Sequence, residues 1–187
     1  MKSVQPSCRP VSKVIVSQSL TFALWLIAGV FSAEVALAQT QPTFDIEDNR
    51  LKLPAAIEFE TGTATIQPTS TASLDHIKAY LDAKSYITTL RIEGHVCCGT
   101  SDVDAQKLSE QRALAIAAYL VSKGVDCKRL LPVGFGPTKP IADGTTPEGR
   151  AQNNRIEIKN AALKDRPIGG MPTDGGGKVA GDPCAGR

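Results

Sequence analysis

Residues 90–120 read LRIEGHVCCGTSDVDAQKLSEQRALAIAAYL, and this stretch decides the fold. Its first four residues alternate apolar and charged side chains, which predicts a half-buried strand that ends at Gly94. A loop then runs to about Asp104. The segment from about Ala105 to Ser122 is predicted to be a helix, and it stops at Gly124, a residue typical of helix C-termini. The stretch is therefore interpreted as a strand, a loop and a long helix.

The flanking sequence continues this alternation of strands and helices. A second helix is predicted to open at 68–70, where Ser and Thr offer capping chemistry, and its apolar stripe is Leu74, Ile77 and Leu81. The other predicted elements are strands at 56–59, 130–135 and 155–158 and a short helix from Pro147. Strands that alternate with helices predict layered α/β packing, with helices on a sheet.

The first 38 residues are predicted to be a secretory signal peptide. They combine a basic start, a short apolar run at 20–33 and the cleavage pattern Ala36-Leu37-Ala38. The apolar run is shorter than the roughly 20 residues that a membrane-spanning helix needs, which disfavours the rival interpretation as an uncleaved anchor. We therefore expect a protein that is exported from the cytoplasm.

The rest of the chain is expected to form one domain between two short extensions. Residues 161–187 are rich in Gly and Pro, so we expect a flexible tail except where Cys184 pins it. The predicted divisions are 1–38, signal peptide; 39–50, short polar leader; 51–160, folded domain; and 161–187, tail.

The charge balance and the motifs narrow the function. Loss of residues 1–38 removes three of the 21 basic and one of the 19 acidic residues, which leaves 18 of each. A net charge near zero makes nucleic acid and anionic membranes poor candidate partners. The sequence has no Gly-x-Ser-x-Gly motif and no phosphate-binding Gly-rich loop. We therefore predict neither an enzyme nor a cofactor.

Arg112 is the candidate binding residue of the long helix. It falls on the same predicted face as Leu108, Ala115, Ile116 and Tyr119. A guanidinium keeps its charge, so on an inward face it needs an anion. One interpretation is an internal salt bridge to Glu93 or Asp104. The other is a ligand carboxylate, held by the bidentate fork of the guanidinium.

Seven sequence blocks carry a resemblance to a known family. They are Ile57-x-Phe59-x-x-Gly62, Ile92-Glu93-Gly94-His95, Leu108-Ser109-Glu110-x-Arg112-Ala113, Tyr119-Leu120 with Gly124-Val125, Gly134-Phe135-Gly136, Pro140-Ile141-Ala142, and Glu148-Gly149-Arg150-Ala151-x-Asn153-x-Arg155-Ile156-Glu157. In this order and spacing, the core resembles the OmpA C-terminal-like domain, the periplasmic peptidoglycan-binding module also found in Pal and MotB. The resemblance implies an α+β fold of the βαβαβ type, a two-layer sandwich with a mixed sheet and helices packed on one face. It also implies non-covalent tethering to the cell wall, not catalysis.

The family's ligand clamp is only half present. In the family an Asp and an Arg hold the ammonium and carboxylate ends of diaminopimelate in the wall peptide. The Arg falls on Arg112, whereas the Asp falls on Cys97. Two further family positions also differ, since the family's Asn falls on Ala105 and one of its Arg residues falls on Asn154. The residues assigned to binding by this comparison are Arg112, Arg155, Asn153, Ser109, the Cys97 position, and Asp102 as a substitute for the missing acid.

Four cysteines remain after the signal peptide, and in an oxidising compartment at least one disulfide is expected. A Cys97–Cys127 bond is disfavoured, because the two flank a helix about 25 Å long and bonded Cα atoms lie within about 7 Å. Cys184 is left as a partner for Cys97, Cys98 or Cys127, and a vicinal Cys97–Cys98 bond is also open. His95-x-Cys97-Cys98 lacks the Cys-x-x-Cys spacing of common zinc sites, so no metal is predicted.

The resemblance thus implies a periplasmic protein, associated with the cell wall or the outer membrane, that binds peptidoglycan through its diaminopimelate-containing stem peptides. Binding is expected to be weaker than in the family, because Cys97 replaces the acidic clamp residue. An envelope protein would supply any membrane anchor. The alternative is a protein-interaction or structural module that kept the fold and lost the ligand.

Overall fold

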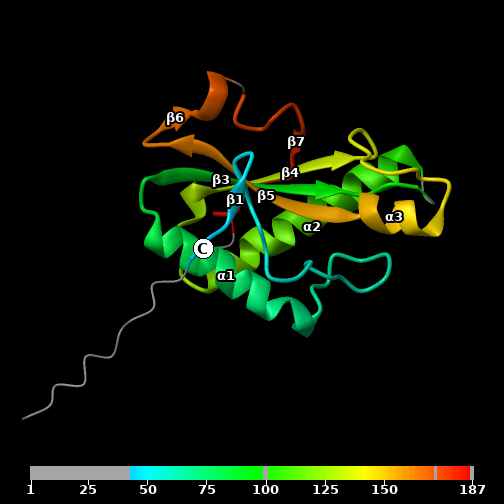
Figure 1. Ribbon diagram of the computed structural model, residues 1–187, viewed down its shortest axis with the longest axis horizontal. Coiled ribbons are helices and arrows are strands. Elements are labelled where there is room, and N and C mark those ends of the chain that lie inside the picture. Colours follow the sequence, from blue (N-terminus) through cyan, green and yellow to red (C-terminus); the bar gives the residue numbers. More distant parts are fainter. Residues whose placement is uncertain (1–42, 99–100, 171, 186–187) are drawn as a thin grey trace, which may run out of the picture. The chain divides into compact units, whose positions relative to one another are not determined.

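The computed structural model describes residues 43–98, 101–170 and 172–185, shown in Figure 1. The predicted signal peptide and the first residues of the predicted leader lie outside these ranges. Within the described ranges, no helix has the length and apolar character needed to cross a membrane.

A seven-stranded mixed sheet forms the centre of the fold. Its order is β1-β2-β5-β3-β4-β7, and β6 adds to β5. The strand β3 pairs in parallel with β4 and antiparallel with β5, so the predicted mixed sheet is confirmed. The strands are β1 (Ile46–Glu47), β2 (Arg50–Leu51), β3 (Ile87–His95), β4 (Leu130–Gly136), β5 (Arg155–Leu163), β6 (Arg166–Pro167) and β7 (Lys178–Val179).

Two long helices, α1 (Thr71–Ala83) and α2 (Asp102–Ser122), pack on one face of this sheet (Figure 1). The predicted stripe Leu74, Ile77 and Leu81 is fully buried against Leu90 and Ile92 of β3. The predicted two-layer arrangement is therefore confirmed. The shorter helical segments are η1 (Pro68–Ser70), η2 (Cys127–Arg129), α3 (Pro147–Asn153) and η3 (Ile168–Gly170).

Helix α2 lies unusually close to strands β3 and β4. A Cβ atom on Gly94 would overlap the backbone carbonyl of Ser109, and one on Gly134 would meet Ser109 Oγ. The Ser109 hydroxyl donates to Gln106 O (2.7 Å) and accepts from the Gly136 N–H (3.0 Å). Glycines on the strands thus let the helix backbone approach, and one buried hydroxyl ties the helix to β4.

The predicted strand at 56–59 and the predicted leader differ from the structure. Residues 56–59 make only an isolated bridge, Phe59 with Ile66. The Glu58 N–H donates to the Ser70 hydroxyl, and the Glu58 carbonyl accepts from that hydroxyl and from the Gln67 N–H. That use of the hydroxyl also means that Ser70 does not cap α1. The described part of the leader forms the hairpin β1–β2, whose turn residues Asp48 and Asn49 adopt positive φ.

The tail is the largest departure from the expected organisation. The strand β5 continues to Leu163, past the predicted domain boundary at 160. Beyond it, β6 pairs with β5, and β7 pairs with the edge of β4. An edge strand presents unpaired backbone groups, and the tail satisfies them without needing apolar side chains of its own. In Figure 1 β6 lies on the side of the sheet away from α1, whereas the C-terminal end of the tail is drawn beside the helices. A Cβ atom on Gly181 would lie 3.5 Å from Leu114 of α2.

Both disulfides in the structure are among the pairings that the sequence left open. Cys127 bonds to Cys184, which fastens the end of the tail to the segment after α2. Cys97 bonds to its neighbour Cys98. The disfavoured Cys97–Cys127 pairing is not formed.

The face of the sheet opposite the helices carries a network of ion pairs. Glu93 accepts from Arg91 Nε (2.6 Å) and Lys159 Nζ (3.0 Å). Lys159 Nζ also reaches Glu157 (2.7 Å), which accepts from Arg155 Nε at 2.6 Å. The Arg91 Nη1 group donates onward to the tail at Thr173 O (2.7 Å). The network therefore joins β3, β5 and the tail.

Glu93 stays ionised although its side chain has no exposed surface. Burial alone raises the pKa of its carboxyl, but His95, Lys159 and Arg91 outweigh burial and lower the pKa to about 2. The His95 Nε2 atom lies 3.4 Å from the carboxylate, and neither ring nitrogen has a hydrogen-bond partner among the described residues, so we assign most of the lowering of the Glu93 pKa to the two cations.

We expect Cys184→Ser to destabilise the fold markedly. The Cys127–Cys184 bond spans a sequence separation of 57 residues. Closure of a loop of this length stabilises a fold by up to about 4 kcal/mol. Urea denaturation of the oxidised protein measures the loss, with Cys98→Ser as the matched control because the vicinal bond closes no loop. Equal losses in the two variants would contradict the role of the tail.

We expect Glu93→Gln to remove part of the pH dependence of stability. A carboxyl whose pKa falls on folding stabilises the fold above its unfolded pKa, and this stabilisation is lost as the pH falls. The window for Glu93 runs from about pH 4.5 down to about pH 2. The stability gap between wild type and variant should be about 3 kcal/mol near neutral pH and should close towards pH 2. Urea denaturation across this range measures it, and a gap independent of pH would refute the assignment. The exposed Glu60→Gln variant is the control.

Candidate functional site

Arg112 projects from the middle of α2 into a pocket of about 260 Å³. The guanidinium lies 4.8 Å from the centre of the Phe59 ring, and its Nε donates to Thr63 O at 2.9 Å. The loop that follows Phe59 therefore positions the side chain from one side and α2 from the other. The pocket is lined by Thr61, Gly62, Val96, Cys97, Cys98, Leu108, Arg112 and Asn154.

Neither carboxylate that the sequence suggested for Arg112 is paired with it. Glu93 belongs to the ion-pair network on the other face of the sheet, and Asp104 accepts from the Ser101 hydroxyl at 2.7 Å. Among the described residues, no ion pair involves Arg112 and no hydrogen bond uses its two terminal nitrogens. Burial lowers the pKa of the guanidinium, yet arginine stays charged in proteins. The fork is thus a partly desolvated cation that faces a pocket.

Cys97 follows the end of β3 by two residues and lines the same pocket as Arg112. It is buried, and its backbone N–H donates to Asn154 Oδ1 at 2.9 Å. Its Sγ lies 3.6 Å from Asn153 Nδ2. The family resemblance predicts that Asn153 binds the ligand, but the residue that lines the pocket is Asn154, which departs from the family pattern.

Asn153 and Ser109 lie beneath the site instead of lining it. Asn153 is 1% exposed, and its Oδ1 accepts from the N–H groups of Ile141 (2.7 Å) and Ala142 (3.0 Å). Ser109 is fully buried in the contact between α2 and β4 described above. Both residues are therefore structural, because their hydrogen bonds fix the segments that carry Arg112 and Cys97.

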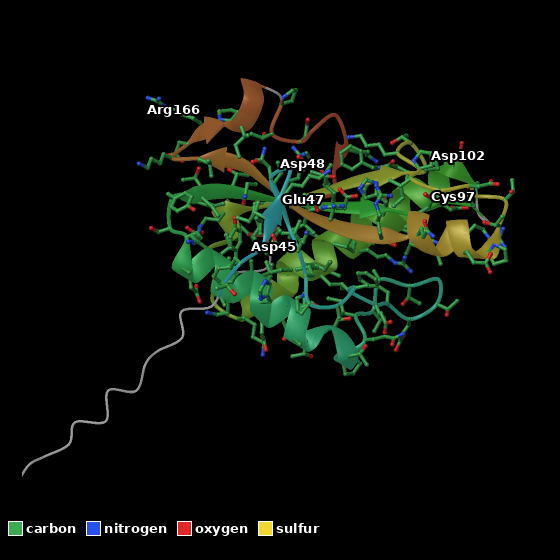
Figure 2. The ribbon with its side chains drawn as sticks, viewed as in Figure 1. Asp45, Glu47, Asp48, Cys97, Asp102 and Arg166 are labelled. Carbon is green, nitrogen blue, oxygen red and sulfur yellow. A yellow bond between two sulfur atoms is a disulfide. The ribbon has the colours of Figure 1, made fainter. Side chains whose placement is uncertain are left out.

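Arg155 and Asp102 lie outside the Arg112 pocket. Arg155 belongs to the ion-pair network through Glu157. Asp102 begins α2 and lines a separate, larger pocket of about 650 Å³ together with Val103 and Pro137. Figure 2 shows Asp102 and Cys97 at the same end of the molecule. Asp102 shares that end with Cys97, but it is not a lining residue of the Arg112 pocket.

One cluster has spacing that suits a metal ion. Ligand atoms of Glu93, His95 and Glu157 lie within 4.8 Å of one another. Both carboxylates already accept from arginine, and Lys159 lies between them, so a divalent ion would meet three fixed positive charges. The His95 ring stacks on Phe135 with centroids 5.2 Å apart. We interpret this cluster as part of the framework. The sulfur atoms of Cys97 and Cys98 are bonded to each other, so they are not thiolate ligands.

The sequence and the structure of this chain are similar to those of one known protein family. The model of the OmpA family matches residues 58–155. The probable lipoprotein YiaD of Escherichia coli is 36% identical over 115 residues, which cover 60% of this chain and 51% of YiaD. Peptidoglycan-binding protein ArfA of Mycobacterium bovis is 42% identical over 84 residues, which cover 45% of this chain and 24% of ArfA. Outer membrane protein A of Bordetella avium is 38% identical over 101 residues, 54% of this chain and 52% of that protein. The chain thus spans about half the length of YiaD and of the Bordetella protein.

Solved structures show the same architecture. The peptidoglycan-associated lipoprotein of Burkholderia pseudomallei superposes with a TM-score of 0.51 at 25% identity, over 58% of this chain and 89% of that one. The periplasmic domain of Helicobacter pylori MotB gives a TM-score of 0.52 at 20% identity, over 64% and 82% of the two chains, a likeness of fold. The family match spans more than half of the sequence and includes β3, α2 and the Arg112 pocket, so the chain belongs to the OmpA family.

Proposed function

We propose that this protein binds peptidoglycan non-covalently in the periplasm and that the Arg112 pocket is its binding site. The observation that carries the proposal is the guanidinium fork, which faces a pocket with no internal carboxylate paired to it among the described residues. Two family relatives, ArfA and the Burkholderia lipoprotein, are named for peptidoglycan binding or association, which supports the same ligand class here.

The chemistry of the pocket suits the carboxylates of wall stem peptides. A free guanidinium fork binds a carboxylate through two parallel hydrogen bonds, and partial burial strengthens them. The stacked Phe59 ring and the Thr63 carbonyl hold the fork in one orientation, so little side-chain entropy is lost on binding. A diaminopimelate-containing stem peptide is our proposed ligand, bound through its carboxylate.

Binding is proposed to be weaker than with an acidic clamp, because Cys97 contributes no charge to the pocket. In keeping with the family, the domain acts as a binding module and not as an enzyme. We further propose that the protein is exported by a cleaved signal peptide. An envelope partner would supply its membrane anchor.

A second candidate function is favoured by the Cys97 position itself. If a neutral sulfur and Asn154 leave too few contacts for a wall peptide, the fold would serve as a protein-interaction or structural module. The unpaired Arg112 argues against this alternative. A partly buried cation without a counter-charge costs folding free energy, and a bound ligand carboxylate would offset that cost.

We expect the purified protein to be retained by peptidoglycan sacculi and Arg112→Ala to weaken that retention at least tenfold. A charge-assisted bidentate contact is worth about 1.5–3 kcal/mol, which corresponds to a tenfold change or more. A sedimentation assay with sacculi, titrated over protein concentration, measures the change. Arg166→Ala is the matched control, since Arg166 is exposed on β6 and Figure 2 shows it at the opposite end of the molecule from Cys97.

Absent retention of the wild type would favour the interaction module. Equal retention of wild type and Arg112→Ala would remove the Arg112 pocket as the binding site. Circular dichroism of each variant separates loss of binding from loss of fold.

A further inference from the structure

The side chains that line the Arg112 pocket carry a positive charge and no negative charge. Arg112 is the one ionised side chain among the eight residues that line it. The others are aliphatic (Val96 and Leu108), neutral polar (Thr61 and Asn154), a glycine, or the two disulfide-bonded sulfur residues. The pocket can therefore neutralise an anion, but its lining offers nothing to neutralise a cation.

Three acidic residues of β3 and of the start of α2 do not line the pocket. Asp104 accepts from Ser101 at the first turn of α2, and Asp102 lines the other pocket. Glu93 is held by Arg91 and Lys159 on the far face of the sheet. The lining of the pocket, as the structure describes it, therefore holds no carboxylate.

This asymmetry discriminates between two forms of the same ligand. A free ammonium group next to the carboxylate would lose water without gaining a counter-charge, and Arg112 would repel it. An acylated amine is a neutral amide, and it can lie against Val96, Leu108 and the sulfur atoms without that cost. The Nδ2 donor of Asn154 makes no hydrogen bond within the described residues and can serve the amide carbonyl.

We infer that the Arg112 pocket selects stem peptides whose diaminopimelate side-chain amine is acylated, as it is in a peptide cross-link, over stem peptides in which that amine is free. The inference rests on the proposed function and sharpens it from peptidoglycan in general to its cross-linked portion. It makes Cys97 a specificity determinant, because its lack of charge decides which amine the site accepts.

Isothermal titration calorimetry with two synthetic probes tests this selectivity. One probe is a stem peptide that ends in diaminopimelate with a free side-chain amine, and the other is the same peptide acetylated on that amine. We expect the acetylated peptide to bind the oxidised wild-type protein at least tenfold more tightly near neutral pH. The comparison needs no variant, so it does not depend on how any substitution folds.

Two double variants assign the selectivity to the charge at position 97. Cys97→Asp with Cys98→Ser should reverse the preference towards the free amine, whereas Cys97→Asn with Cys98→Ser, which is isosteric and neutral, should keep it. Tighter or equal binding of the free-amine peptide by the wild type would overturn the inference and leave the proposed function standing. Retention by sacculi with neither peptide bound would do the same. Failure of both sacculi and peptides to bind would overturn the proposed function as well.

Discussion

The contact between the backbone of helix α2 and strand β3, at Ser109 and Gly94, is the constraint on which the rest of the structure depends. Any side chain at Gly94 would overlap the Ser109 carbonyl, so the helix can lie at this depth only over glycine. Arg112 follows Ser109 by about one turn of α2, and Cys97 follows Gly94 by three residues. One close packing contact therefore sets the position of both walls of the pocket.

The parts of the fold that follow from side-chain periodicity were predictable from the sequence. The stripe of α1 and the alternation of β3 report burial directly, because burial follows the apolar side chains. Gly124 marks the end of α2 for a different reason, since it adopts a positive φ that other residues disfavour. The β1–β2 hairpin and the tail were not predictable in this way. Their docking uses backbone hydrogen bonds to β4 and β5, which leave little trace in composition. Gly177 is an example. A Cβ atom at this position would overlap the side chains of Val133 and Phe135, so the tail can dock here only because glycine has no side chain.

The candidate site was half predictable for a related reason. The sequence indicated that Arg112 needs an anion, but it could not decide between an internal and an external one. Which anion Arg112 meets depends on how the strands pair. Lys159 of β5 lies opposite Arg91 of β3, so both cations contact Glu93, and the Glu93 carboxylate is not paired with Arg112 on the helix face. Ser109 and Asn153 were assigned to binding because they share sequence blocks with ligand-binding residues. Their burial shows that a block of this kind can hold a framework residue beside a surface one.

The bond between Cys127 and Cys184 also makes a covalent ring of the second half of the domain. This ring encloses β4, the exposed loop around Ile141, α3 and β5. A protease that cut the loop would therefore leave both fragments joined through sulfur, and the sheet would keep its strands in register. The domain would thus tolerate a single cut in this loop without losing either part of its sheet.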